Sequence, residues 1–220
     1  QPRLVSRFGC TRTETLRRRS AACLATAMYL LKGTPFLYQG EEIGMTNFPF
    51  RDETQLRDVE SLNLLAQARK DGREAWAWNG IRKKGRDNAR TPMQWDASAN
   101  AGFTAGTPWI DVNPNYRQIN VHEAQADPDS ILHFYRRLLA LRQGSDALRS
   151  GTFRLLLPEH PQLLAYERAC GEERIRVCCN FSGAPAVLPP EMQGDCLLCD
   201  GVENGRMEPY GLCCVQLLHH

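Results

Sequence analysis

The sequence predicts an α/β protein that ends in a small antiparallel β domain. Two observations lead to this fold class. An amphipathic helical segment is followed directly by a short apolar run, which is the order of elements in α/β proteins. After about residue 148 the pattern changes to short strand-like runs separated by turn residues. We therefore predict two domains, residues 1–147 and residues 148–220.

The first element is a predicted helix over residues 13–32. Its apolar side chains, such as Leu16 and Cys23, recur on one side at helical spacing. Gly33 and Pro35 end it, because glycine is favoured just past a helix and proline cannot continue one. The apolar run at residues 36–38 is then expected to form a short buried strand.

The middle region, residues 39–129, contains a second predicted helix and a long loop. Residues 54–69 carry apolar side chains at helical spacing. Residues 84–118 are rich in Asn, Gly and Pro and have aromatic side chains among them. A loop of this length in a compact domain is usually functional. A clear helix returns at residues 131–143.

The last part of the chain has the pattern of an antiparallel β domain. Short runs at residues 152–157, 163–168 and 174–181 are separated by proline and glycine turns. We expect these strands to form a β-sandwich-like domain over residues 148–220.

Composition excludes two classes of partner. The 220 residues carry a formal net charge of +2, which gives no electrostatic reason to bind nucleic acid or an anionic membrane. No apolar run approaches the roughly 18 residues of a membrane span. The chain opens on Gln1 without a signal-like segment, so we expect a cytoplasmic protein.

Nine cysteines allow two interpretations, a metal cluster or buried thiols. Cys196 and Cys199 have the spacing of metal ligands, but the two leucines between them are typical of a strand. Adjacent cysteines such as Cys178 and Cys179 point to opposite faces of a strand, so each such pair should have at most one inward thiol. We expect the cysteines to act as small buried hydrophobic residues. None of the five histidines has a ligand-like spacing, and we expect no metal and no cofactor.

Five motifs occur in order along the chain. They are QPRLVSRFG at 1–9, GTPFLYQGEEIGMTN at 33–47, RDVESLN at 57–63, GRDNARTPMQWD at 85–96 and NAGFTAGTPWIDVNPNY at 100–116. This series resembles the alpha-amylase-like glycoside hydrolases, specifically their oligo-1,6-glucosidase and alpha-glucosidase branch. The resemblance implies the C-terminal part of a (β/α)8 TIM barrel, including the long excursion after the eighth strand, followed by the β domain. In such barrels the loops after the strands carry the active site.

The resemblance also implies that the catalytic carboxylates precede this chain. The stabilising Asp would come immediately before Gln1, and the nucleophile Asp and acid Glu would lie further upstream. Glu41 and Glu42 follow the predicted eighth strand. Neighbouring residues leaving a strand diverge, so these two cannot flank one bond at the roughly 5–5.5 Å separation of a retaining pair. We therefore expect no catalytic residue in residues 1–220 and no activity from this chain alone.

Three residues are predicted to bind substrate. By the resemblance, Arg86 and an upstream Asp hold the terminal glucose, Glu60 contacts the second sugar, and Arg90 braces the same wall. A guanidinium suits this task because its planar fork donates to adjacent hydroxyls. From pattern alone each could be an ordinary surface residue, and Glu60 lies at the edge of the apolar stripe of its helix.

The function that the resemblance implies is a retaining, exo-acting alpha-glucosidase that acts on isomalto- and malto-oligosaccharides and is a monomer when full length. A trehalose-6-phosphate hydrolase is the first alternative, since that enzyme shares QGEEIGMTN and DVESLN. The segment KGRDNAR at 84–90 and VNPNY at 112–116 favour the glucosidase. A non-catalytic, transporter-associated subunit of the same fold is the second alternative.

Overall fold

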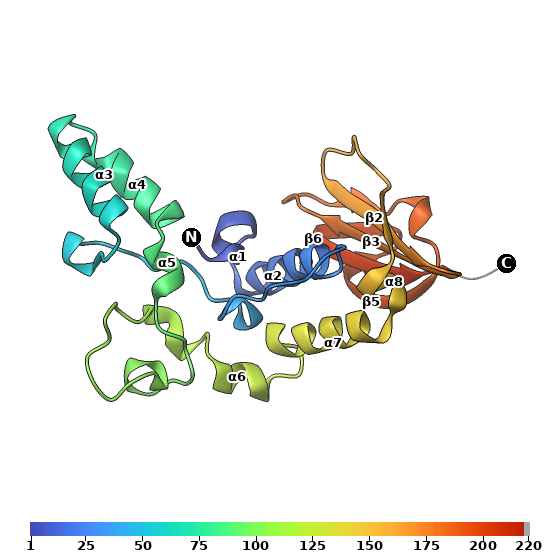
Figure 1. The fold of residues 1–220 in the computed structure, drawn as a ribbon, viewed down its shortest axis with the longest axis horizontal. Coiled ribbons are helices and arrows are strands. Elements are labelled where there is room, and N and C mark those ends of the chain that lie inside the picture. Colours follow the sequence, from blue (N-terminus) through green and yellow to red (C-terminus); the bar gives the residue numbers. More distant parts are fainter. Residues whose placement is uncertain (218–220) are drawn as a thin grey trace. The chain divides into compact units, whose positions relative to one another are not determined.

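The computed structural model describes residues 1–217, so His219 and His220 lie outside the described residues. The chain forms two compact units (Figure 1). The first unit contains Gln1–Phe8 and Tyr38–Leu132, and the second contains Gly9–Leu37 and His133–His220. Each unit is thus built from two separate stretches of chain. The division between residues 147 and 148 that the sequence predicts remains a prediction.

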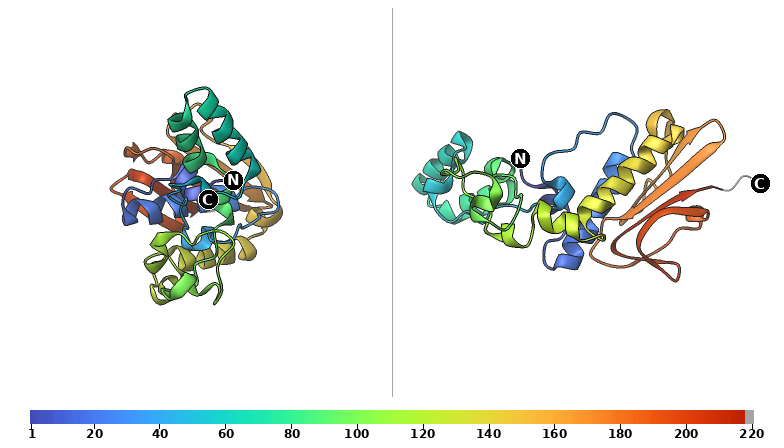
Figure 2. Two further views of the ribbon diagram at one scale, coloured as in Figure 1. Left: turned by 90° about the vertical axis from the view of Figure 1, so that its left-hand side faces the viewer. Right: turned by 90° about the horizontal axis from the view of Figure 1, so that it is seen from below.

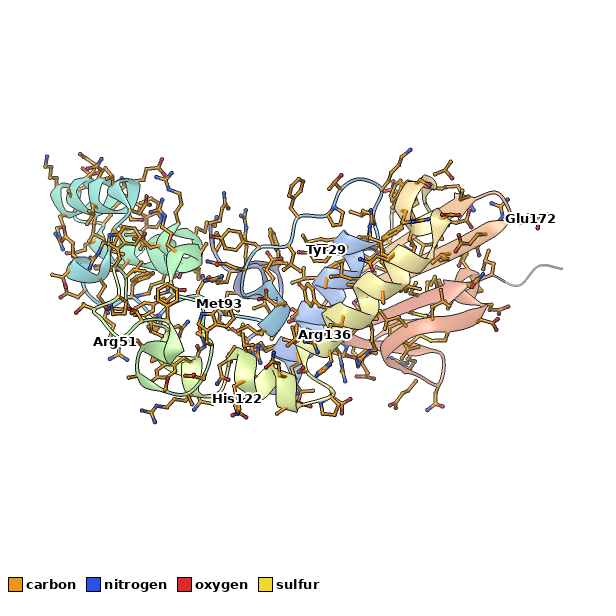
Figure 3. All side chains as sticks on the ribbon, turned by 60° about the horizontal axis from the view of Figure 1, so that its bottom comes forward. Tyr29, Arg51, Met93, His122, Arg136 and Glu172 are labelled. Carbon is orange, nitrogen blue, oxygen red and sulfur yellow. A yellow bond between two sulfur atoms is a disulfide. The ribbon has the colours of Figure 1, made fainter. Side chains whose placement is uncertain are left out.

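The second unit is centred on a six-stranded antiparallel sheet. Its strands run in the order β1-β2-β3-β6-β4, and β5 also pairs with β6. Tyr166 and Cys214 both lie opposite Val177 in the β2-β3-β6 register, so these three residues form one row across the sheet. The strands are β1 (Thr152–Leu155), β2 (Leu163–Cys170), β3 (Glu173–Asn180), β4 (Ala186–Val187), β5 (Asp195–Glu203) and β6 (Arg206–Gln216). In Figure 3, Glu172 marks the tight turn between β2 and β3.

Helix α2 (Glu14–Tyr29) packs against strands β3 and β6. It begins at Thr13, whose side-chain oxygen accepts a hydrogen bond from the backbone N–H of Leu16, as expected of an N-cap. Helix α7 (Ile131–Gly144) runs beside α2 (Figure 2), and the rings of Tyr29 and Tyr135 meet edge to face at 5.5 Å. The short helix α8 (Asp146–Ser150) then leads into β1.

Two buried arginines close the C-terminal end of α2. Arg142 donates hydrogen bonds to the carbonyls of Tyr29 and Leu31, at 2.7 and 2.8 Å. Arg168, whose side chain is fully buried, donates to the carbonyl of Leu30 at 2.8 Å. The last carbonyls of a helix have no partner within the helix and carry partial negative charge. The two cations satisfy these groups and join α2 to the β domain.

The first unit is mostly helix and loop. Helices α3 and α4 lie side by side (Figure 1) and enclose a small core with Phe50, Leu65 and Ile81. A second small core contains Met45 and Met93. The helices are α1 (Leu4–Phe8), α3 (Val59–Lys70), α4 (Glu74–Lys84), α5 (Asp87–Arg90) and α6 (Val121–Ala126). Short 3-10 turns occur at Glu41–Ile43, Glu53–Gln55, Ala99–Gly102 and Pro114–Arg117, and one more, Pro190–Met192, belongs to the second unit.

The structure corrects two local expectations and adds one helix. Residues 36–38 form no strand, and Phe36 is 85% exposed. A parallel barrel strand needs a neighbour that pairs with it, and all strand pairing within residues 1–217 is antiparallel and belongs to the β domain. The helix expected over 54–69 begins only at Val59, because a capping box at Asp52 and Gln55 forms a separate turn before it. Helix α4 was not predicted.

The cysteine expectation is confirmed for six residues and wrong for three. Cys10, Cys23, Cys178, Cys179, Cys213 and Cys214 are buried. Cys170 is an exposed free thiol, and the exposed pair Cys196 and Cys199 forms a disulfide. Within residues 1–217, no group of three or more potential ligands is placed to hold a metal ion, and no helix is long and apolar enough to cross a membrane.

Both members of each adjacent cysteine pair are buried, which also corrects the expectation of one inward thiol per pair. The reason is that both faces of the sheet are covered. Cys179 lies against α2, with its Sγ 3.6 Å from the carbonyl of Cys23, while Cys178 lies on the other face, 3.6 Å from the Sδ of Met207. Burial raises the pKa of both Cys178 and Cys214 to about 12, so these thiols stay protonated.

Candidate functional site

The stretch Gly85–Asp96 is held in place by the buried Arg3. Arg3 donates hydrogen bonds to the carbonyl of Asn88 at 3.0 Å and to the carbonyl and hydroxyl of Thr91 at 3.2 and 3.1 Å. It also reaches the carbonyl of Gln39 at 2.7 Å. Burial lowers the pKa of Arg3 from its ordinary value, and all these acceptors are uncharged. Arg3 therefore connects three of the five sequence motifs at one point.

Asn88 fixes the same stretch to the end of α4. Its amide nitrogen donates to the carbonyls of Gly85, Ile81 and Arg82, at 3.0, 3.3 and 3.3 Å. Its side-chain oxygen Oδ1 accepts from the backbone N–H of Phe48 at 2.9 Å. A fully buried asparagine with all these bonds made gives the loop a single conformation.

Asp87 positions the start of α3 in the same way. Its Oδ2 accepts from the backbone N–H groups of Arg57 and Asp58, at 2.7 and 2.9 Å. Its Oδ1 accepts from Arg90 Nη1 at 3.0 Å. The buried carboxylate thus holds Asp58 next to helix α5, although the two are 29 residues apart in sequence.

The charged cluster of the site is centred on Asp58. Its Oδ1 accepts from Arg86 Nη2 at 2.8 Å and Nε at 3.0 Å, and Arg90 Nη1 lies 3.6 Å away. The hydroxyl of Ser61 donates to Oδ2 at 3.0 Å. Arg86 Nη2 also lies 3.2 Å from Glu60 Oε1. The side chain of Asp58 is 4% exposed, whereas those of Arg86 and Glu60 are 44% and 77% exposed.

This arrangement keeps Asp58 ionised. Burial acts to raise its pKa, but the hydrogen bonds from Arg86 and Ser61 outweigh burial, so the pKa lies below its ordinary value. The carboxylate is therefore a fixed negative charge that holds Arg86 by one edge, while the rest of the arginine side chain remains open to solvent.

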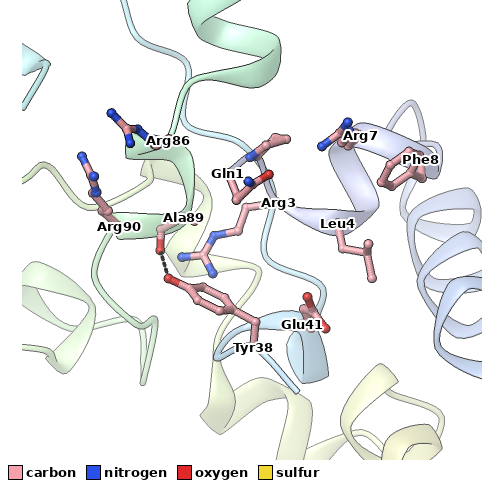
Figure 4. A pocket seen from close by; sticks show the side chains of 11 residues that line it. Gln1, Arg3, Leu4, Arg7, Phe8, Tyr38, Glu41, Arg86, Ala89 and Arg90 are labelled. Atoms are coloured by element: carbon pink, nitrogen blue, oxygen red, sulfur yellow. Dashed lines mark hydrogen bonds between the residues drawn. The ribbon is translucent and has the colours of Figure 1, made fainter. Parts of the chain in front are cut away.

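A pocket of about 350 Å³ lies beside this cluster (Figure 4). Figure 4 shows Arg86 and Arg90 extending on the same side of helix α5. Tyr38 forms another wall, and its hydroxyl donates to the carbonyl of Ala89 at 3.1 Å. Glu41 also lines the pocket, whereas Glu42 accepts from the backbone N–H of Gly40 at 2.8 Å. The two neighbouring glutamates therefore take different positions.

The structure brings the three predicted site residues together and adds two acids. Arg86 and Arg90 contact Asp58, Glu60 contacts Arg86, and Asp87 pairs with Arg90. Sequence reasoning missed both aspartates, although both belong to the quoted motifs. A signal for Asp58 was present in the sequence. A partly buried arginine needs a carboxylate to balance its charge, and Asp58 lies only two positions before the predicted site residue Glu60.

The sequence profile described as "Alpha amylase, catalytic domain" matches residues 1–151. This chain belongs to the alpha-amylase family. It is 50% identical over 184 residues to the oligo-1,6-glucosidase of Parageobacillus thermoglucosidasius, covering 83% of this chain and 32% of that protein. It is 40% identical over 223 residues to the trehalose-6-phosphate hydrolase of Bacillus subtilis (strain 168), covering 96% and 39%.

Solved structures of the alpha-amylase family agree with this fold. The trehalose-6-phosphate hydrolase of Bacillus licheniformis superimposes with a TM-score of 0.90 at 41% identity, covering 100% of this chain and 42% of that one. The trehalulose synthase MutB of Pseudomonas mesoacidophila MX-45 gives a TM-score of 0.90 at 36% identity, covering 98% and 41%. The chain has the fold of the C-terminal part of a TIM-barrel glycoside hydrolase with its β domain. It spans about a third of the length of the oligo-1,6-glucosidases it matches.

Proposed function

We propose that this chain is the C-terminal part of a retaining, exo-acting alpha-glucosidase that removes terminal glucose from isomalto- and malto-oligosaccharides. The observation that carries the proposal is the anchoring of Arg86 by the buried Asp58 at the edge of a pocket. The identity of 48% and 50% to two oligo-1,6-glucosidases supports it.

In this proposal the residues of this chain hold sugars and do not perform the bond cleavage. Arg86, fixed by Asp58 on one edge, donates from its exposed edge to adjacent hydroxyls of the terminal glucose. Glu60 contacts the second sugar, and Arg90 braces the wall between Asp58 and Asp87. A charged clamp that closes one end of the pocket makes the enzyme act on chain ends. The nucleophile Asp, acid Glu and stabilising Asp would come from the part of the enzyme that precedes Gln1.

A trehalose-6-phosphate hydrolase is the second candidate. It is favoured by the 48% identity over 183 residues to the trehalose-6-phosphate hydrolase of Escherichia coli (strain K12). The two candidates share the clamp of the terminal glucose and differ in what the second sugar carries. For either enzyme we propose a cytoplasmic monomer that needs no cofactor and has no nucleic-acid or membrane partner.

The test is a substrate panel with the protein expressed together with its upstream coding sequence. Glucose release is measured from isomaltose, maltose and trehalose 6-phosphate at equal concentrations. We expect isomaltose or maltose to be the best substrate by kcat/KM. A preference for trehalose 6-phosphate would replace the first candidate with the second, and no hydrolysis of any of the three would favour a non-catalytic member of the family.

A further inference from the structure

Helix α4 carries an exposed tryptophan, Trp76. The buried side of the helix, with Ala77 and Ile81, packs into the core that α4 shares with α3. Trp76 is 59% exposed, and the guanidinium of Arg73 lies 5.3 Å from the centroid of its ring. One exposed tryptophan is not by itself a binding site, because single apolar side chains are common on protein surfaces. Its surroundings decide whether it has a role.

Trp76 lines a groove of about 550 Å³ between α3 and α4. This volume lies within the roughly 300–1,000 Å³ of small-molecule sites. Trp76, Gly80 and Lys84 are four residues apart and therefore lie on one side of α4. Leu64 of α3 contributes a second apolar side chain. The groove thus has an aromatic and an aliphatic surface with polar groups at its edges.

Gly80 keeps the middle of the groove open. A Cβ atom at this position would meet no other atom within 4 Å, so packing does not require a glycine there. Glycine is also a poor residue for a helix interior and costs about 1 kcal/mol relative to alanine. The absence of a side chain at Gly80 therefore leaves space in the groove at a cost in helix stability.

The groove continues directly from the charged cluster. Asp58, Glu60 and Arg86 line it, and Arg86 also lines the first pocket. A chain of sugars that has its terminal unit at Arg86 and its second unit at Glu60 would meet this groove next.

We propose that the groove between α3 and α4 binds further glucosyl units of the substrate, those beyond the sugar that Glu60 contacts. This inference rests on the proposed function. A pyranose ring presents an apolar C–H face that fits Trp76 and Leu64, and its hydroxyls can pair with Asn79 and Lys84.

The test compares substrates of different length in the full enzyme. In Trp76→Ala the stacking surface is lost, and in Gly80→Leu the groove is filled by a side chain that a helix accepts well. The matched control is Trp109→Ala, because Trp109 is similarly exposed and lies outside the groove. We expect the kcat/KM ratio of isomaltotetraose to isomaltose to fall about tenfold in both groove variants and to stay as in wild type in the control. An unchanged ratio in both groove variants would overturn the proposal.

A binding measurement separates this inference from the proposed function. Isomaltotetraose is titrated into the same proteins while tryptophan fluorescence is recorded. If the enzyme hydrolyses no isomalto-oligosaccharide, the proposed function has failed, but a fluorescence change that Trp76→Ala abolishes still supports the groove. Absence of this change in wild type, or a change caused by trehalose 6-phosphate and not by isomaltotetraose, would overturn it.

Discussion

Arg86 places two nitrogens within 3.0 Å of one carboxylate oxygen of Asp58, so the aspartate holds the arginine by a single edge. Because Asp58 is buried and the side chain of Arg86 is 44% exposed, the aspartate fixes the arginine while part of the guanidinium stays accessible to solvent. Asp87 positions Asp58, and Asn88 positions Gly85, the residue before Arg86. Asp87 and Asn88 both lie between Arg86 and Arg90 in sequence.

Replacing Arg86 by alanine should lower kcat/KM of the full enzyme on isomaltose by roughly ten- to a hundredfold. The loss corresponds to about 1.5–3 kcal/mol for a charged hydrogen-bonding partner. Arg86→Lys should recover little, because a point charge cannot reproduce the planar fork. Arg90→Ala should lower the melting temperature more than it changes kcat/KM, since Arg90 braces Asp58 and Asp87. If Arg86→Ala stays folded and keeps wild-type efficiency, the clamp assignment is wrong.

Replacing Asp58 by asparagine should destabilise the enzyme in a pH-dependent way. The pKa of Asp58 is lowered in the fold, so its carboxylate contributes stability above its unfolded pKa of about 3.9. This contribution is lost as the pH falls through the lower folded value. We expect a difference of about 1–3 kcal/mol from wild type at pH 7 that is unchanged at pH 5 and shrinks below about pH 4. Urea unfolding at several pH values measures it, and a difference that grows on acidification would contradict the ion pair.

Replacing Arg168 by methionine should destabilise the second unit strongly. Besides Leu30, this side chain donates to the carbonyls of Thr152, Leu148 and Gly151, each at 3.0 Å. Methionine keeps most of the volume but leaves these buried carbonyls without a donor. We expect the free energy of unfolding to fall by about 3–5 kcal/mol.

The control for this prediction is the half-exposed Arg174 of the neighbouring strand. Its guanidinium lies 3.9 Å from Glu167, a distance at which a surface ion pair contributes little. Arg174→Met should therefore change the melting temperature by only a degree or two. Equal effects of the two substitutions in thermal unfolding would show that Arg168 is not an essential cap.

Residues 1–220 expressed alone should release no glucose above background from isomaltose or p-nitrophenyl alpha-glucoside. We propose that the charged cluster around Asp58 holds a sugar, but a retaining hydrolase also needs two carboxyls at opposite sides of the bond. Glu41 and Glu42 do not supply them, because only Glu41 lines the pocket, while Glu42 turns back to accept from the N–H of Gly40. Hydrolysis at an enzyme-like rate by this chain would refute the motif assignment.

Local pattern was sufficient for two helices and three strands of the second unit, and did not predict α8, β4, β5 or β6. The helices at 13–32 and 131–143 were predicted within three residues of Glu14–Tyr29 and Ile131–Gly144, and strands β1, β2 and β3 were all predicted. These elements have clear end signals, such as Gly33 and Pro35 after α2 and the turn residues between the strands. Helix α4 has weaker local signals, because Arg73 at its N-terminal end makes no side-chain capping hydrogen bond and Gly80 lies in its interior, and the sequence does not predict it.

The sequence by itself determined the family and the candidate residues Arg86, Glu60 and Arg90, because ordered motifs carry that information without any contact. Only the tertiary structure decided that Asp58 is the carboxylate that holds Arg86, since 28 residues separate them and Asp87 brings them together. The tertiary structure also decided the conformation of residues 36–38. Their apolar side chains favour a strand, but a strand forms only where another strand pairs with it through hydrogen bonds. Strand pairing and ion pairs between residues far apart in sequence form only in the folded chain, so a local sequence pattern does not reveal them.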